Sequence, residues 1–251
     1  MENVKSAKPN IVNVDTPEDL AIAACDRFIQ LGRKAITNKG AFHVAISGGH
    51  TPTRFFQLLG VGPISETLEW DKVQVFWVDE RCVSPEAEAS NYRLAARTFL
   101  DKVPIPISNV HRVTGECDDY SEAVAEYEQT IRRVFNLEHG RMPQFDLIVL
   151  GMGAGGHIGS LFPNSYALFD TDDLVSTVYF MDGNYNRITL THPVLCAAEQ
   201  LMILISGSEK AKIVKEVMQN ELDDVKYPVH TLWPILHKVT WLIDSEAAKH
   251  L

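Results

Sequence analysis

Short apolar runs alternate along the chain with longer segments in which apolar residues recur at helical spacing. The runs predict five strands, at residues 41–47, 72–80, 145–151, 200–207 and 238–244. The helical spacing predicts helices at residues 16–36, 51–60, 90–100, 121–135 and 208–218. Strands that alternate with helices indicate an α/β fold with a mostly parallel sheet covered on both faces. No repeat, linker or shift in composition divides the chain, so we expect a single domain over residues 1–251.

Ligands of open parallel sheets bind at the carboxyl ends of the strands. Four predicted strands lead directly into stretches rich in glycine or charge. In chain order these stretches are "SGGHTP", "DER", "GMGAGGH" and "SGSEK". We therefore expect a functional site assembled from these four strand ends.

Composition narrows the class of ligand. A formal net charge of −10 argues against a nucleic-acid binder, which needs a basic surface, but not against a small phosphorylated substrate. No apolar stretch reaches the roughly 20 residues of a membrane span, and the N-terminus lacks a signal-peptide pattern. The four cysteines are scattered and form no metal-binding spacing, which is typical of a reducing compartment. We expect a cytoplasmic protein, a monomer, without metal or cofactor.

The stretch "ISGGHTPTRFF" connects a strand to a helix through Gly48 and Gly49. The backbone amides of Gly49, His50 and Thr51 would lie at the helix N-terminus, where an anion is stabilised. The alternative is a tight turn followed by an ordinary Thr-Pro cap. The stretch is not a Walker loop, because no GK[ST] follows the glycines.

The stretch "FWVDERCVS" places Asp79, Glu80 and Arg81 directly after an apolar run. Alternation along a strand sends Asp79 and Arg81 to one side and Glu80 to the other. These charges could line a site, or they could form a structural ion-pair network.

The stretch "GMGAGGHIGSLFP" contains His157 in a glycine-rich strand end. Residues 151–156 fit GxGxxG, but no ribose-binding acid follows at the expected distance, so a dinucleotide site is disfavoured. His157 is either a structural histidine or a general base near Ser160. Arg187 in "NRITLT" and Lys210 in "SGSEKAK" would complete a phosphate clamp if they converge on the "SGGHT" amides.

Taken together, these segments resemble the 6-phosphogluconolactonase family. The resemblance runs from about residue 15 to 245 and rests on "SGGHTP", "WDKVQVFWVDERCVSPEAEASNY", "VPIPISNVHRV", "FDLIVLGMGAGGHIGSLFP", "RITLTHPVL" and "SGSEKA". It implies an open, Rossmann-like α/β sheet shared with the glucosamine-6-phosphate deaminases. It also implies a cytosolic, metal-free hydrolase that converts 6-phospho-D-glucono-1,5-lactone to 6-phosphogluconate in the oxidative pentose phosphate pathway.

The resemblance also implies roles for individual residues. His157 matches the catalytic base, and Asp79 and Arg81 match positions lining the active site, with Arg81 near substrate oxygens. The substrate phosphate is expected at Ser47, Gly48, Gly49, Thr51, Arg187 and Lys210.

The chain departs from the family pattern beside the base. The usual acid two residues before the histidine is replaced by Gly155, and Ile158 follows the histidine as in the deaminases. The deaminase pattern has a glutamate where this chain has Phe162, so the lactonase pattern is favoured. Two alternatives stay open: a catalytically silent sugar-phosphate-binding protein, and a deaminase-like enzyme. For the lactonase, we expect lowered activity unless another group, such as Asp79, orients His157.

Overall fold

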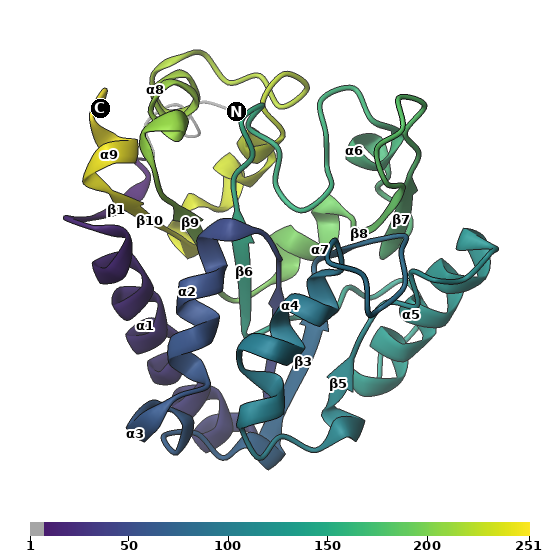
Figure 1. Cartoon of the computed structure of the whole chain (residues 1–251). Coiled ribbons are helices and arrows are strands. Elements are labelled where there is room, and N and C mark those ends of the chain that lie inside the picture. The colour runs from purple at the N-terminus through teal and green to yellow at the C-terminus, as the bar shows by residue number, and fades with distance from the viewer. Residues whose placement is uncertain (1–7) are drawn as a thin grey trace.

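A twisted sheet of seven strands forms the centre of the molecule in the computed structural model, which describes residues 8–251 (Figure 1). Every pair of neighbouring strands in it is parallel. Its order is β1 (Asn10–Val14), β10 (Val239–Asp244), β9 (Leu201–Ile205), β6 (Leu147–Gly151), β2 (Phe42–Ile46), β3 (Val73–Trp77) and β5 (Val110–His111). The predicted fold class, an open and mostly parallel α/β sheet, is confirmed.

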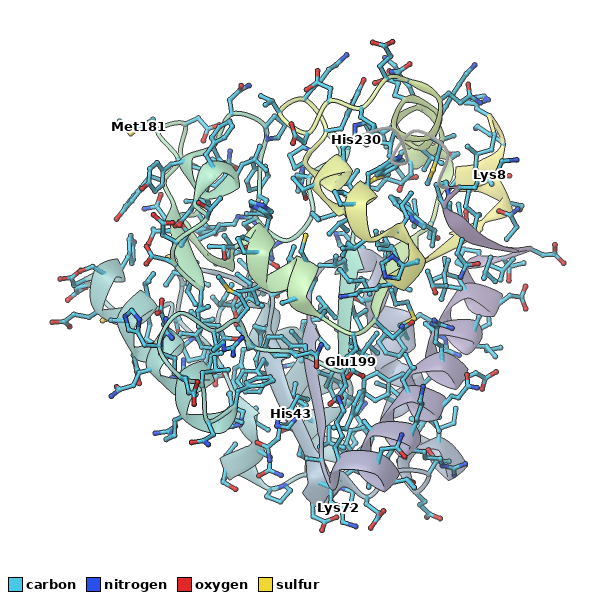
Figure 2. The ribbon with its side chains drawn as sticks, turned by 180° about the vertical axis from the view of Figure 1, so that it is seen from behind. Lys8, His43, Lys72, Met181, Glu199 and His230 are labelled. Carbon is cyan, nitrogen blue, oxygen red and sulfur yellow. The ribbon has the colours of Figure 1, made fainter. Side chains whose placement is uncertain are left out.

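Helices cover both faces of this sheet, as predicted. The α-helices are α1 (Pro17–Lys39), α2 (His50–Leu59), α3 (Gly62–Ser65), α4 (Asn91–Thr98), α5 (Tyr120–Val134), α6 (Tyr166–Phe169), α7 (His192–Ala197), α8 (Ala211–Gln219) and α9 (Ser245–Ala248). Helices α1, α2 and α4 lie on the face turned to the viewer in Figure 1. Helix α7 and the 3₁₀ segment Pro228–Lys238 lie on the face seen in Figure 2.

Strand burial follows from this two-sided cover. All five residues of β9 and all six of β10 are buried, so these strands are almost wholly apolar rather than alternating. The longest helix, α1, starts where the sequence predicts, because Thr16 and Asp19 form a capping box. It ends at Gly40, whose φ of 80° is the left-handed conformation that glycine adopts without strain.

The predicted strand at 72–80 is divided in the structure. β3 ends at Trp77, and Asp79–Arg81 form β4, which belongs to a second, antiparallel sheet. In that sheet β4 pairs with β8 (Arg187–Leu190), which pairs with β7 (Val175–Val178). The division arises at Val78, whose amide donates to Ile46 in the large sheet while its carbonyl accepts from Leu190 in the small one.

The small sheet and the edge strands β1 and β5 escape prediction because each is short and lacks a long apolar run. The predicted helix 208–218 begins as a 3₁₀ turn, Ser208–Lys210, before α8. Within residues 8–251, no helix is long and apolar enough to cross a membrane. The expectation of a single domain stays a prediction.

Candidate active site

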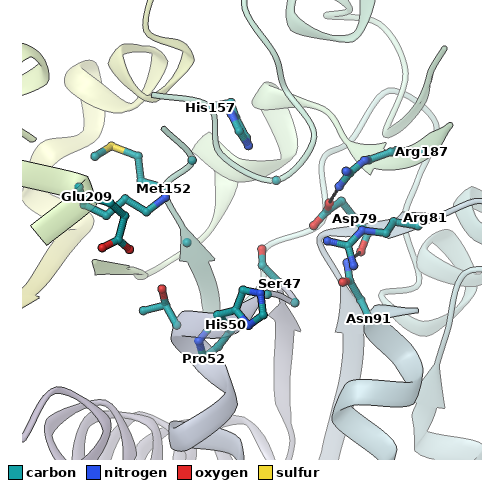
Figure 3. A pocket seen from close by; sticks show the side chains of 17 residues that line it. Ser47, His50, Pro52, Asp79, Arg81, Asn91, Met152, His157, Arg187 and Glu209 are labelled. Carbon is teal, nitrogen blue, oxygen red and sulfur yellow. Dashed lines mark hydrogen bonds and ion pairs between the residues drawn. The ribbon is translucent and has the colours of Figure 1, made fainter. Parts of the chain in front are cut away.

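A cavity of about 260 Å³ opens at the carboxyl end of the large sheet (Figure 3). Four strand ends meet there, as predicted. All nine residues that the sequence singles out line it: Ser47, Gly48, Gly49, Thr51, Asp79, Arg81, His157, Arg187 and Lys210. The sequence therefore predicts the location of the cavity and much of its lining.

The turn between β2 and α2 forms the floor of the cavity. Gly49 has a φ of 105°, a conformation that disfavours any side chain, and it directly precedes α2. A Cβ at Gly48 would lie 2.0 Å from Oδ1 of Asn91, so this glycine allows α4 to approach. The hydroxyl of Ser47 is buried and has no hydrogen-bond partner among the described residues. The helix N-terminus and this unpaired hydroxyl together suit an anionic ligand.

One wall carries Arg187 and Asp79 side by side on the small sheet. Nη1 of Arg187 lies 3.9 Å from Oδ2 of Asp79, which accepts a 2.7 Å hydrogen bond from the hydroxyl of Ser160. Burial raises the pKa of Asp79, while Ser160 and Arg187 act in the opposite direction. Nε of Arg187 is buried without a partner in the described part of the chain. The guanidinium therefore retains capacity to bind a further acceptor.

Arg81 and Glu80 point to opposite sides of β4, so the predicted alternation is confirmed. Arg81 lines the cavity and donates a 2.6 Å hydrogen bond to the carbonyl of Ala89. Glu80 turns toward α4, where it accepts hydrogen bonds from the amides of Asn91 and Tyr92. Glu80 is therefore a structural carboxylate that holds the start of α4 beside the cavity.

Lys210 comes from the loop after β9. The buried carboxylate of Asp244, at the end of β10, accepts hydrogen bonds from the hydroxyl of Ser206 and the amide of Gly207. This anchors the loop, and Glu209 and Lys210 reach the cavity from it. Lys210 and Arg187 thus belong to different walls of one cavity, as a clamp requires.

His157 enters the cavity from the glycine-rich loop after β6 (Figure 3). Its ring lies directly over Gly153, where a Cβ would fall 1.9 Å from Cε1, and packs on the ring of Phe162 with 4.3 Å between centroids. Burial, together with the charges of Arg187 and Lys210, lowers the pKa of His157 to about 4. The imidazole is therefore neutral at neutral pH, the state that a general base requires.

No carboxylate of residues 8–251 forms an ion pair with His157. The suggestion that Asp79 orients His157 is wrong, because the Asp79 side chain is engaged by Ser160 and Arg187 instead. At Gly155, a Cβ would meet only Cγ of Pro163, at 4.0 Å, and φ there is not positive. An acid could therefore be accommodated at that position, and this chain does without it.

The cavity includes side chains that sequence reasoning did not assign to it. These are chiefly His50, Asn91 and Glu209, which line its floor and two walls. Each lies within one residue of an assigned position or inside a quoted segment, but their direction depends on the tertiary structure. Among the described residues, no three His, Cys, Asp or Glu side chains lie close enough together to hold a metal ion.

Comparison with known proteins gives one consistent match. The profile of the family "Glucosamine-6-phosphate isomerases/6-phosphogluconolactonase" matches residues 15–241. The 6-phosphogluconolactonase of Nostoc sp. is 37% identical over 217 residues, covering 86% of this chain and 88% of that protein. A probable 6-phosphogluconolactonase of Arabidopsis thaliana is 33% identical and covers 100% of this chain and 97% of its own length.

Solved structures agree with this match. The 6-phosphogluconolactonase of Trypanosoma cruzi superposes with a TM-score of 0.86 at 27% identity, covering 97% of both chains. A monomeric glucosamine-6-phosphate deaminase superposes with a TM-score of 0.81 at 21% identity, covering 96% of this chain and 100% of its own, which shows a shared fold. The chain belongs to the glucosamine-6-phosphate isomerase/6-phosphogluconolactonase family, as the resemblance of its motifs predicts.

Proposed function

We propose that this protein is a 6-phosphogluconolactonase in which neutral His157 activates water. One observation carries the proposal: the uncharged imidazole of His157 opens into the same cavity as the cations Arg187 and Lys210 and the start of α2. A base and an anion site in one cavity suit a phosphorylated substrate whose reacting group lies some distance from its phosphate. The names of the relatives support the choice of substrate.

The phosphate would bind at the floor of the cavity. The amides that begin α2 and the unpaired hydroxyl of Ser47 offer donors, and Arg187 and Lys210 offer charge. Such charge-assisted hydrogen bonds are the stronger kind, and they fix the far end of the substrate. The remote phosphate then holds the lactone carbonyl near His157.

Hydrolysis would proceed by one proton relay. His157 accepts a proton from water while the water oxygen forms a bond to C1 of the lactone, giving a tetrahedral oxyanion and an imidazolium. Arg81, which lines the cavity, or nearby amides would stabilise the oxyanion. The bond between C1 and the ring oxygen then breaks, and the imidazolium returns the proton to that oxygen. The product is the open-chain acid, and His157 is again neutral.

Phosphate binding would also strengthen the base. Burial is the main reason that the pKa of His157 is lowered, and the charges of Arg187 and Lys210 contribute to the lowering. A phosphate dianion between them offsets their charge, so we expect the His157 imidazole to titrate at higher pH when inorganic phosphate is bound. NMR titration of the ring protons, assigned with the His157→Gln variant, measures this. An unchanged titration at saturating phosphate would place the anion elsewhere.

A catalytically silent sugar-phosphate-binding protein is the second candidate, favoured by Gly155 and by the absence of a carboxylate beside His157 among the described residues. One assay separates the two. The purified protein is expected to hydrolyse 6-phosphogluconolactone faster than buffer does. Binding of the phosphosugar without acceleration would establish the silent protein instead. Release of ammonia from glucosamine 6-phosphate would establish a deaminase, which Phe162 at the glutamate position disfavours.

Restoring the acid at position 155 tests how much activity the chain loses by having a glycine there. Gly155→Asp is expected to raise kcat about tenfold, well below the roughly 10⁴-fold effect of a carboxylate in a triad enzyme, because packing already holds the His157 ring. Gly155→Asn is the matched control, since it adds the same volume without charge. Steady-state kinetics of both variants give the answer. Equal kcat values for the Asp and Asn variants would show that a carboxylate at this position does not contribute to catalysis.

We further infer that the protein is a cytoplasmic monomer that needs no cofactor. All four cysteines are free, which supports a reducing compartment. The catalytic groups named above come from one chain, which is compatible with activity as a monomer. Size-exclusion chromatography with light scattering tests the oligomeric state.

A further inference from the structure

Four side chains and one glycine form a continuous stack, of which Gly153, His157 and Arg187 line the cavity. The His157 ring rests on Gly153 and against Phe162, at 4.3 Å between ring centroids. The guanidinium of Arg187 lies 5.6 Å from the centroid of Phe162 and 5.8 Å from that of Phe180. Phe180 in turn meets Phe162 edge-to-face at 5.2 Å. Phe162 is thus the member that contacts both the base and the cation.

We propose that Phe162 is the positioning residue for His157 and couples the base to Arg187, taking over the orienting task of the absent acid. This inference rests on the proposed lactonase function. Phe162 does not touch the reacting atoms. It acts by holding the plane of the imidazole so that one ring nitrogen faces the bound water.

The need for such a residue follows from the hydrogen-bond pattern. A catalytic imidazole is usually held by a hydrogen bond from its second nitrogen to a carboxylate or carbonyl. Among the hydrogen bonds of the described residues, none involves the His157 ring, although the loop backbone is tied down by a 2.9 Å hydrogen bond from the amide of Gly153 to the carbonyl of His157. The ring is therefore located by contact. Gly153 leaves it no room on one side, and Phe162 supplies the aromatic contact.

The contact with Arg187 gives Phe162 a second role. A cation over an aromatic ring is attracted by the negative face of the ring, and the attraction is stronger when the pair is shielded from water. Phe162 therefore helps to hold the guanidinium that we place on the substrate phosphate. The Phe162 ring thus orients His157 and also supports Arg187, so the positions of these two side chains depend on each other. A glutamate at this position would supply neither aromatic contact.

The chain offers a matched control at the opposite end of the sheet. There the ring of Phe135 packs on His43 at 4.7 Å between centroids and with an interplanar angle of 38°, the same angle as between Phe162 and His157. His43 and Phe135 lie outside the cavity. Phe135→Leu thus removes a comparable pair without touching the site. Comparing it with Phe162→Leu separates positioning from general packing.

Phe162→Leu is expected to lower kcat roughly 10- to 100-fold, the scale on which small misplacements of reacting groups act, while KM rises less than about fivefold. Phe162→Tyr keeps the ring and is expected to restore kcat to within about threefold of the wild type. Phe135→Leu is expected to leave both constants within about twofold. Gly153→Ala, which pushes the ring from its other contact, should reproduce the loss in kcat.

A second readout does not depend on turnover. Removing the Phe162 ring lets water reach the imidazole, so the pKa of His157 should rise from about 4 toward its ordinary value. NMR titration of the ring detects this in Phe162→Leu and should show no change in Phe135→Leu.

Three results would overturn the inference: equal kcat losses in the two leucine variants, a loss confined to KM, or failure of tyrosine to rescue kcat. A wild-type protein that does not hydrolyse the lactone would contradict the proposed function instead. In that case the NMR titration alone would test the inference.

Discussion

The variant His157→Gln is expected to lose roughly 10²- to 10⁴-fold in kcat, the usual contribution of a general base. Glutamine keeps a polar side chain of similar length but cannot accept the proton from water. KM should change little, because the proposed phosphate contacts of Arg187 and Lys210 remain. His111→Gln is the control: the pKa of His111 is also lowered to about 4, but this histidine stacks on Phe76 outside the cavity. Equal kcat in the His157 variant and the wild type would remove His157 from the mechanism.

The same substitution is expected to stabilise the protein in acid. The pKa of His157 is about 4 in the folded protein and 6.5 in an ordinary setting, so between these values the unfolded chain binds the additional proton. The free energy of unfolding of the wild type therefore falls as the pH drops from about 6.5 to 4, and glutamine removes this loss.

At pH 5 we expect His157→Gln to be more stable than the wild type by about 1–2 kcal/mol, after some loss of ring packing. At pH 8 the advantage should vanish. Urea titrations at the two pH values measure the difference. An advantage of equal size at both would show that it does not arise from protonation of His157.

Arg187→Gln is expected to raise KM for 6-phosphogluconolactone roughly 30- to 150-fold, which corresponds to the 2–3 kcal/mol of a hydrogen bond to a charged group. The guanidinium is half-buried, its Nε is unpaired within the described structure, and it lies beside the buried Asp79. Arg187→Lys should not restore affinity fully, because an ammonium cannot present the same planar fork above Phe162.

Two controls sharpen this result. Arg97→Gln removes an exposed arginine from the end of α4 and should leave KM unchanged. Unphosphorylated glucono-1,5-lactone is expected to be a poor substrate whose kcat/KM is affected far less by Arg187→Gln. If both lactones lose the same factor, Arg187 does not act through the phosphate. The loss would then come from disruption of the stack or of Asp79.

Local sequence predicts the elements of the large sheet well where the pattern is long. The runs that became β6, β9 and β10 are almost continuously apolar because helices cover both faces, and α1 carries its own caps. The edge strand β5 has only two residues, Val110 and His111, and leaves no periodicity to detect. The break at Val78 has no glycine or proline to mark it, and it follows from hydrogen bonds to Ile46 and Leu190, which lie far away in the chain.

The candidate site likewise has features that local sequence predicts and features that it does not. Glycines with a charge or histidine directly after a predicted strand are visible in the sequence, and the rule that parallel sheets bind ligands at carboxyl ends brings them together. Together with the site roles that the family resemblance implies, this named nine residues of the cavity lining. It could not show that Glu80 holds the start of α4, or that Asp79 is engaged by Ser160 rather than by His157.

The sequence by itself determined the fold class, the strand ends that build the cavity and the presence of a histidine without its usual acid, because these depend on local periodicity and on residue type. Only the tertiary structure decided what surrounds that histidine. The antiparallel pairing of β4 with β8 sets Arg81 opposite Arg187, and the loop after β6 lays His157 between Gly153 and Phe162. These contacts join residues far apart in the chain, and their geometry follows from packing.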